Sequence, residues 1–218
     1  MTERIDATVN EISTPERIKT EALRLFLEEG YRGAAVRDIA ERLGFTVPAL
    51  YYHFKNKDAI LEAIVEPFAD AGEALLARLA TAAQVSSPCE LEVAAIEGYY
   101  DVIAGHLDVF RFVSTDRAVR SNPVAGHRLA DQATRFLDLL AGADADHDRR
   151  LRAAAAVGAV RRPLRMPGTD LEADRAAIVA AALAALRSMV SGSAPGRMVV
   201  TVTMGNSTSG NWSTPMRG

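Results

Sequence analysis

A helical repeat of apolar residues extends over nearly all of residues 14–190 and constrains the fold more than any other feature. Between 14 and 30, for example, Ile18, Ala22, Leu25 and Phe26 recur at the three- and four-residue spacing of one helix face. Similar segments, each bounded by Pro, Gly, Asp or Asn, cover 36–43, 46–54, a long stretch from Asn56, 88–106, 108–119, 123–141, 144–162 and 170–190. No alternating strand pattern of useful length lies among them. The sequence therefore predicts an all-α fold.

Composition limits the classes of function. The chain has 218 residues, 49% hydrophobic and 24% charged, enough for one medium domain or for a small head joined to a larger body. Its net charge is −3, so any nucleic-acid binding must come from a local patch rather than from bulk charge. The single cysteine, Cys89, excludes an internal disulfide framework and suits a reducing cytoplasm.

The two ends of the chain differ in character from the helical part. The N-terminal MTERIDATVNEIS carries acids and no apolar run, which predicts a flexible arm over 1–13 rather than a signal peptide. Residues 191–218 are rich in Gly, Ser and Thr and contain no acid, which predicts a disordered tail. The longest apolar stretch, 176–186, is much shorter than the ~20 residues that cross a bilayer. We expect a cytoplasmic protein with no membrane partner.

The stretch LGFTVPALYYHFKNKDAIL, residues 43–61, has the layout of a helix-turn-helix. The small Ala40 lets two short helices cross closely, and Gly44 permits the backbone conformation of a tight turn. On the second short helix Leu50 and Phe54, four residues apart, are expected to face inward. This leaves an outward set of Val47, Ala49, Tyr51, Tyr52 and His53.

The outward set suits a DNA groove. Hydroxyl and imidazole groups can meet phosphate oxygens, and apolar atoms can meet thymine methyl groups. No Asp or Glu occurs between Arg42 and Lys57, which favours a polyanionic partner. The alternative is an ordinary amphipathic helix whose polar face happens to be aromatic.

The block from Pro15 to Ile64 resembles the DNA-binding head of the TetR family of bacterial transcriptional repressors. The resemblance is carried by Ala22, Phe26, Gly30-Tyr31, Val36-Arg37-Asp38-Ile39-Ala40, Leu43-Gly44, Leu50-Tyr51-Tyr52-His53-Phe54 and Lys57. The rest of the chain resembles the family only in the number and length of its helices. The resemblance implies a three-helix helix-turn-helix head over 14–58 and a larger helical ligand-binding and dimerisation body over 59–190.

The resemblance also implies roles for single residues in binding double-stranded DNA. Arg37 would reach a guanine or a phosphate, and Thr46 would cap the third helix and touch the DNA backbone. Bases would face Val47, Pro48 and Ala49, whereas phosphates would be held by Tyr51, His53 and Lys57, with Tyr52 on the same face. Lys57 would act from the N-terminus of the fourth helix, where the helix dipole also favours an anion.

One departure from the family pattern concerns the start of the second helix. Family members usually place Thr or Ser there, which caps the helix and often touches phosphate, whereas this chain has Ala34 and Ala35. A lost N-cap typically costs ~1 kcal/mol. A lost phosphate contact would weaken DNA binding without changing its sequence preference.

Two late segments are apolar all round. Residues 153–160 and 176–186 contain no polar side chain, and a helix of this kind must be buried all round. The resemblance implies that these last two long helices pair with their symmetry mates, so that a homodimer presents two heads to a palindromic operator. Burial within one chain is the alternative.

The middle helices hold most of the remaining aromatic residues, and the resemblance implies that such helices surround a small-molecule cavity. The candidate ligand-binding residues are Phe68, Tyr99, Tyr100, His106, Phe110, Phe112, His127 and Phe136. As a set they predict an apolar effector with one or two polar groups. For several of them a place in an ordinary helical core is the alternative, since Ile96, Tyr99, Tyr100, Ile103 and Leu107 also form a core stripe.

Catalytic and metal-binding patterns are missing from the sequence. It contains no GxSxG, no phosphate-cradling glycine loop, no HExxH and no CxxC, and its histidines lack metal-ligand spacing. The sequence therefore predicts a protein that is not an enzyme and needs no cofactor. It predicts a ligand-responsive repressor that a small effector releases from its operator. Two alternatives are a DNA-binding regulator without a small-molecule ligand and a dimeric interaction protein that has lost DNA binding.

Overall fold

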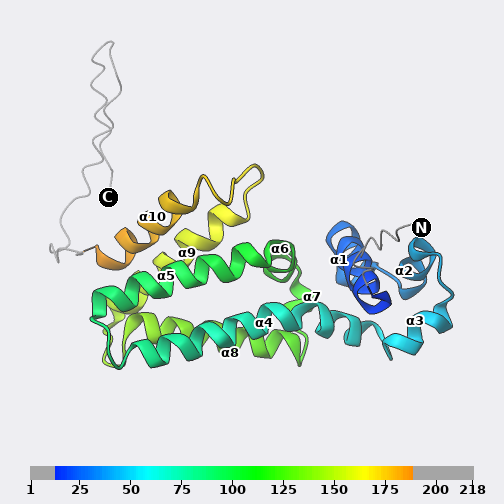
Figure 1. Cartoon of the computed structure of the whole chain (residues 1–218), viewed down its shortest axis with the longest axis horizontal. Coiled ribbons are helices and arrows are strands. Elements are labelled where there is room, and N and C mark those ends of the chain that lie inside the picture. The colour runs from blue at the N-terminus through cyan, green and yellow to red at the C-terminus, as the bar shows by residue number, and fades with distance from the viewer. Residues whose placement is uncertain (1–12, 189–218) are drawn as a thin grey trace, which may run out of the picture. The chain divides into compact units, whose positions relative to one another are not determined.

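The structure is a computed structural model that describes residues 13–188. Within this range the chain consists of helices and connecting loops, without a strand (Figure 1). The helices are α1 (Thr14–Gly33), α2 (Val36–Leu43), α3 (Val47–His53), α4 (Lys57–Ala82), α5 (Pro88–Gly105), α6 (Leu107–Thr115), α7 (Arg117–Arg120), α8 (Ala125–Ala141), α9 (His147–Leu164) and α10 (Arg175–Arg187). The prediction of an all-α fold is confirmed. The predicted tail and all but the last residue of the predicted arm lie outside the described residues.

Two glycines set the path of the N-terminal head. The helical conformation of α1 is interrupted at Gly30, where φ is 76° and ψ is 158°. Gly44 ends α2 with φ 69° and ψ 26°, and its N–H donates to the carbonyl oxygens of Ala40 and Glu41. Residues with a Cβ rarely adopt such positive φ values. These turns let α2 fold back against α1 and let α3 pack against α2.

Side-chain caps determine where several helices begin. The Thr46 hydroxyl accepts a hydrogen bond from the Ala49 N–H at 3.3 Å, and Asn56 Oδ1 accepts one from the Ala59 N–H at 2.7 Å. Ser87 and Glu90 form a reciprocal capping box at the start of α5. Because these bonds satisfy N–H groups that have no partner inside the helix, they fix the starts of α3, α4 and α5.

The head has a core that continues into the body. Ile18, Leu25, Ile39 and Leu50 are fully buried there, together with the first half of α4. Phe112 of α6 belongs to the same cluster and stacks on Phe26 of α1, with ring centroids 5.6 Å apart. The predicted division into residues 14–58 and 59–190 stays a prediction, since α4 passes through it without a break.

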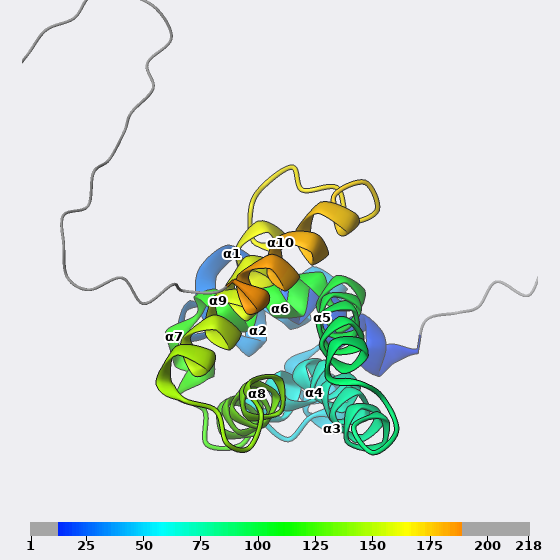
Figure 2. The ribbon, with the colours of Figure 1, turned by 90° about the vertical axis from the view of Figure 1, so that its left-hand side faces the viewer.

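The body is a layered helical bundle. The second half of α4 packs against α5 and α8, while α9 and α10 pack against each other and against α5 (Figures 1 and 2). Its core draws on Leu75 and Leu79 of α4, Ile96 of α5, Phe136 of α8 and Val160 of α9. The structure thus has an N-terminal helix-turn-helix head and a larger helical body.

Two predicted helix boundaries are wrong. The segment 108–119 is not one helix, because Asp116 has extended backbone angles and its carboxylate caps a separate α7 by accepting from the Ala118 and Val119 N–H groups. The last helix starts at Arg175 instead of Asp170, since turns occupy the residues before it.

Among the helices of residues 13–188, none combines the length and the apolar character that a membrane span requires.

Candidate nucleic-acid interface and ligand cavity

Helix α3 buries one side chain fully and exposes most of the others. Leu50 is fully buried in the head cluster, and the partly buried Val47 and Phe54 pack against that cluster. Ala40 is also buried, and its carbonyl oxygen accepts from the Phe45 N–H at 2.8 Å, which brings α2 and α3 close. The helix therefore has one orientation on the head and a defined outer face.

The outer face of α3 carries the aromatic and polar groups that the sequence predicts. Tyr51 is 47% exposed and Tyr52 is 86% exposed, while Pro48, Ala49 and His53 are also on the surface. The Tyr52 and His53 rings lie edge to face at 5.2 Å. Large aromatic side chains exposed together on one short helix indicate a binding surface. We call Pro48, Ala49, Tyr51, Tyr52 and His53 the α3 face.

The neighbouring predicted contacts fall into different environments. Arg37, at the start of α2, is 81% exposed, and its Nε lies 3.9 Å from the Asp38 carboxylate, so its guanidinium can still reach a phosphate or a base. Thr46 caps α3 as predicted. Val47, however, is partly buried against the head core, so less of its side chain is available to a base than an outward position would offer.

Lys57 does not lie free at the start of α4. Its Nζ donates to the Tyr31 carbonyl oxygen at 2.7 Å and to the Ala34 carbonyl oxygen at 2.9 Å, and it lies 4.5 Å from the centre of the Tyr31 ring. Burial lowers its pKa, whereas Asp58 and Asp116 oppose that shift. Two of its three N–H groups are thus used inside the protein, and its first role is to tie α4 to the α1–α2 connection.

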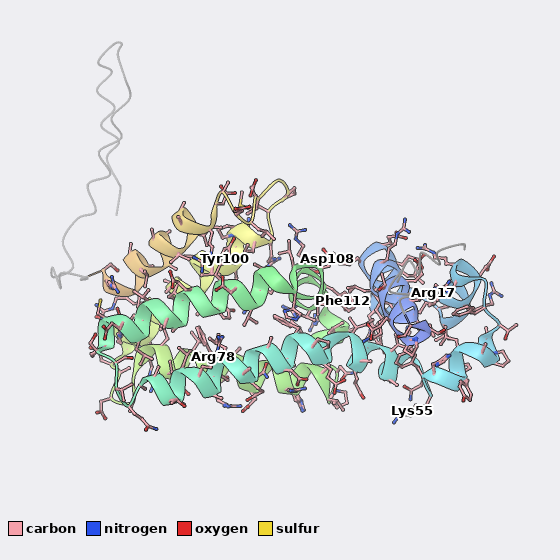
Figure 3. All side chains as sticks on the ribbon, viewed as in Figure 1. Arg17, Lys55, Arg78, Tyr100, Asp108 and Phe112 are labelled. Carbon is pink, nitrogen blue, oxygen red and sulfur yellow. The ribbon has the colours of Figure 1, made fainter. Side chains whose placement is uncertain are left out.

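A second lysine, Lys55, is the exposed cation near α3 that Lys57 was expected to be. Lys55, between α3 and α4, is exposed beside the α3 face (Figure 3). Lys55 was not among the DNA-binding residues predicted from sequence, although its place in the acid-free stretch before Lys57 was a usable signal. Arg42 is a weaker candidate, because its guanidinium lies among the carboxylates of Glu21, Glu28 and Glu29.

Helix α2 begins without a side-chain cap. The N-cap residue is Ala35, which has extended backbone angles of φ −101° and ψ 146° and is exposed, and no side chain accepts from the first turn. We expect Ala35→Ser to raise the free energy of unfolding by about 0.5–2 kcal/mol, because the hydroxyl could accept from an unpaired N–H of that turn. Urea unfolding followed by circular dichroism measures this difference.

The matched control for that substitution is its neighbour. Ala34 is only 1% exposed, so Ala34→Ser would bury a hydroxyl and should lower stability. If Ala35→Ser is no more stable than the original chain, the missing cap is not a weak point of α2.

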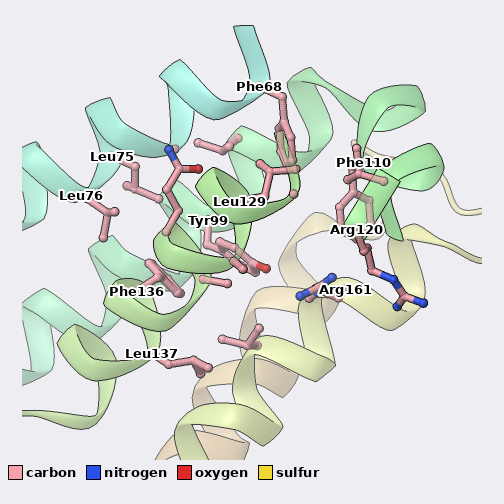
Figure 4. Close-up of a pocket in the computed structure, with 18 of the residues that line it drawn as sticks. Phe68, Leu75, Leu76, Tyr99, Phe110, Arg120, Leu129, Phe136, Leu137 and Arg161 are labelled. Atoms are coloured by element: carbon pink, nitrogen blue, oxygen red, sulfur yellow. The ribbon is translucent and has the colours of Figure 1, made fainter. Parts of the chain in front are cut away.

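The body contains a cavity of about 300 Å³ between α4, α5, α6, α7, α8 and α9 (Figure 4). Most of its lining is apolar. Four of the predicted ligand-binding residues line it, namely Phe68, Tyr99, Phe110 and Phe136. The Tyr99 and Phe136 rings stack at 4.6 Å. The size lies at the lower end of ligand pockets in proteins, which span roughly 300–1,000 Å³.

The other four residues predicted to bind a ligand are not among those that line this cavity. Tyr100 is buried on another side of α5, where its hydroxyl donates to the Leu171 carbonyl oxygen. Phe112 packs in the head core, and His127 is on the surface. His106 lies at the end of α5, where its Nδ1 is 3.0 Å from the Val102 carbonyl oxygen. Residues a position or two apart on a helix face different sides, which composition alone cannot resolve.

The sequence analysis also missed the polar groups of the cavity. Arg120, Gln132 and Arg161 contribute to its lining. Gln132 is buried, and its Nε2 donates to the Ala69 carbonyl oxygen at 2.7 Å and to Glu73 Oε1 at 2.8 Å. A buried glutamine with both donors used is a structural link between α8 and α4, whereas the two arginines are available to a ligand.

Comparison with known proteins gives strong similarity in the head. Residues 18–64 match the family model described as bacterial regulatory proteins, tetR family. The tetracycline repressor protein class C of Escherichia coli is 47% identical over 58 residues, which is 27% of this chain and 26% of that repressor. The match thus spans about a quarter of the length of this curated relative.

Solved structures extend the similarity of fold to the body. A transcriptional regulator of the TetR/AcrR family from Thermobifida fusca is 26% identical, with a TM-score of 0.52 over 79% of this chain and 96% of that one. The transcriptional regulator FadR from Bacillus subtilis, solved in complex with stearoyl-CoA, is 19% identical, with a TM-score of 0.51 over 78% of this chain and 97% of that one. At that identity the second likeness concerns the fold alone.

Proposed function

We propose that this chain, whose residues 18–64 match the family model of bacterial regulatory proteins, tetR family, represses transcription by binding a palindromic DNA operator as a homodimer, and that a small effector releases it. The observation that carries the proposal is the α3 face. Its exposed tyrosines, histidine and small residues are backed by the buried Leu50, and no acid occurs in α3. A short helix of this kind fits a major groove, and α3 is the second helix of the helix-turn-helix, which reads bases in such motifs.

The division of labour on DNA follows from exposure. Pro48 and Ala49 are small and exposed, so they allow close approach to base edges. Tyr51, His53 and Arg37 would hold phosphates on either side, with Lys55 as a further exposed cation. Lys57 would contribute less to phosphate binding than Lys55, because its donors are already engaged.

The last two long helices support a homodimer. Each buries only one side within the chain, through Val157 and Val160 on α9 and Ile178 and Ala182 on α10. Their other sides expose small or apolar residues, namely Leu151, Ala154, Ala155 and Gly158 on α9 and Ala177, Ala180, Ala181 and Ala184 on α10. Burial within one chain thus leaves an apolar side uncovered on each helix, and a second copy would cover it.

Gly158 tests this dimer. In one chain a Cβ at Gly158 would meet nothing within 4 Å, so Gly158→Ala should stabilise α9 by about 1 kcal/mol through helix propensity alone. At a close helix–helix interface the same methyl group would overpack and cost about 1–3 kcal/mol. We expect the dimer dissociation constant to rise about 10-fold, measured by sedimentation equilibrium.

The matched control is Gly105→Ala. Gly105 ends α5, and a Cβ there also meets nothing within 4 Å, but it is part of neither α9 nor α10. If Gly158→Ala leaves the dimer dissociation constant unchanged and raises the stability of the protein, Gly158 is exposed to solvent and the dimer interface lies elsewhere.

A chain of contacts connects the cavity to the head. Val113, Val119 and Arg120 line the cavity on both sides of Asp116. Asp116 Oδ2 accepts a hydrogen bond from the Tyr31 N–H at 2.7 Å, so the α6–α7 junction holds the end of α1. Tyr31 in turn accepts from Lys57 at the start of α4. An effector that moves α6, α7 or α4 would therefore alter the placement of the head, and such coupling typically amounts to 1–3 kcal/mol.

The experiment that tests the function is selection of bound sites from a random duplex DNA library. The control is the double variant Tyr51→Ala, His53→Ala, because both side chains are exposed and their removal leaves the core intact. Lys57→Ala is unsuitable as a control, since it would remove the bonds to the Tyr31 and Ala34 carbonyls. Enrichment of one palindrome by the original chain alone supports the proposal, and no enrichment at low salt contradicts it.

A further inference from the structure

The charged side chains that line the cavity are all positive. Two arginines, Arg120 and Arg161, are among its lining residues, and no Asp or Glu is. Among the lining residues, Gln132 donates to the carboxylate of Glu73, and Glu73 is itself 3.0 Å from Arg135 Nη1 outside the lining. An apolar cavity with excess positive charge favours an anionic occupant.

Arg161 is the cation best placed to meet a ligand. It lies on α9, is partly buried, and its guanidinium carbon is 5.6 Å from the centre of the Phe110 ring. None of the ion pairs found within residues 13–188 involves Arg161 or Arg120. A partly buried guanidinium without a carboxylate partner loses hydration without full compensation, so a ligand carboxylate would recover that loss.

Tyr99 adds a second donor beside Arg161. Figure 4 shows the Tyr99 side chain directed toward Arg161, with the Phe136 ring on its other side. Burial raises the pKa of the Tyr99 hydroxyl, and the charge and hydrogen bond of Arg161 oppose that rise only in part. The hydroxyl is therefore protonated at neutral pH and can donate to an anion that Arg161 holds.

From this arrangement we infer that the effector is a compact carboxylic acid with an apolar body. Its body lies among Phe68, Phe136 and the aliphatic side chains, and its carboxylate accepts from Arg161 and Tyr99. Arg120, on α7, adds positive charge at the same cavity and belongs to the segment that holds Tyr31 through Asp116. The cavity volume of about 300 Å³ favours a small acid over a large conjugate. The regulatory consequence rests on the proposed function, whereas the binding does not.

The test is titration calorimetry of the full chain with two pairs of probes that differ in charge. One pair is naphthaleneacetate and its uncharged primary amide, and the other is decanoate and decanol. We expect the carboxylate of at least one pair to bind about 10-fold or more tightly than its uncharged partner, as a charge-assisted hydrogen bond would provide. The aromatic and aliphatic pairs separate a ring-shaped from a chain-shaped body.

Two variants assign the effect to a residue. Arg161→Gln should remove the preference for the carboxylate while leaving binding of the uncharged probe within about 3-fold, because the apolar lining is unchanged. Arg78→Gln is the matched control, since Arg78 is an exposed arginine on α4 outside the cavity lining (Figure 3). Circular dichroism melts of both variants show whether either has lost its fold.

Several results overturn the inference. These are equal or tighter binding of both uncharged probes, a carboxylate preference that survives Arg161→Gln, or no binding of either carboxylate at millimolar concentration. Operator binding is measured separately. If the chain selects a palindrome but does not bind carboxylates, the proposed function is supported and this inference is contradicted. If it binds carboxylates through Arg161 but selects no DNA, this inference is supported and the proposed function is contradicted.

Discussion

Replacing Ala49 by glutamate should lower operator affinity by about 100-fold or more while leaving the protein as stable as before or slightly more stable. Ala49 is exposed in the first turn of α3, so a carboxylate there would face the DNA, where a like-charge contact costs several kcal/mol. Thr46 already caps this turn by accepting from the residue 49 N–H. A Glu at 49 would complete a capping box and should gain about 0.3–1 kcal/mol.

Because operator affinity is expected to fall while stability is kept or raised, a loss of binding cannot be attributed to unfolding. Fluorescence anisotropy of a labelled operator measures affinity, and urea unfolding measures stability. Ala49→Gln is the matched control, because it has almost the same shape and can also complete the capping box, but carries no charge. Full operator binding by Ala49→Glu would show that α3 does not lie in the groove, and a loss of stability would show that the first turn of α3 differs from the one described here.

Removal of the Phe26 ring should lower the free energy of unfolding by about 3–5 kcal/mol, the usual cost of Phe→Ala in a core. Phe26 is 1% exposed, packs edge to face with Tyr31 at 5.3 Å and stacks on Phe112 at 5.6 Å. Whole domains are stable by only about 5–15 kcal/mol, so this single change removes a large share. Thermal and urea unfolding of Phe26→Ala measure the loss.

The same ring tests whether head and body unfold together. Phe26 belongs to α1 of the head and Phe112 to α6 of the body, so a double-mutant cycle between them measures a contact that bridges the two. We expect a coupling energy of about 0.5–1.5 kcal/mol. Tyr52→Ala serves as the control, because Tyr52 is 86% exposed and its removal should change stability by less than about 0.5 kcal/mol. Two separate unfolding transitions in the original chain would contradict a shared core.

Local physics explains which parts of the fold could be predicted from sequence. The periodicity of Ile18, Ala22, Leu25 and Phe26 marks a buried face whatever the helix packs against, and these residues are buried. A glycine such as Gly44 ends a helix because of its own backbone freedom, and Thr46 caps the next helix through a bond only three residues long. The helix-turn-helix could therefore be predicted from sequence, including the inward side of Leu50 and the outward side of Tyr51.

Prediction from sequence failed where a distant contact determines a helix boundary. Asp116 interrupts the apolar segment 108–119, because its carboxylate serves both α7 and the distant Tyr31 N–H. A bond across 85 positions leaves no periodic signal. The wrong prediction of a single helix there thus marks the junction that connects the cavity to the head.

By itself, then, the sequence determined the all-α class, most of the helices with the caps that begin α3 and α4, the inward and outward sides of α3, and the resemblance of the head to the TetR family. Tertiary structure alone decided which partner each outward or polar group meets. It turned Lys57 toward two carbonyl oxygens, took Phe112 into the head core and Tyr100 away from the cavity, and placed Arg161 beside Tyr99. The reason is physical: helix formation and capping involve residues within one or two turns, whereas cavities and ion partners depend on how distant helices cross.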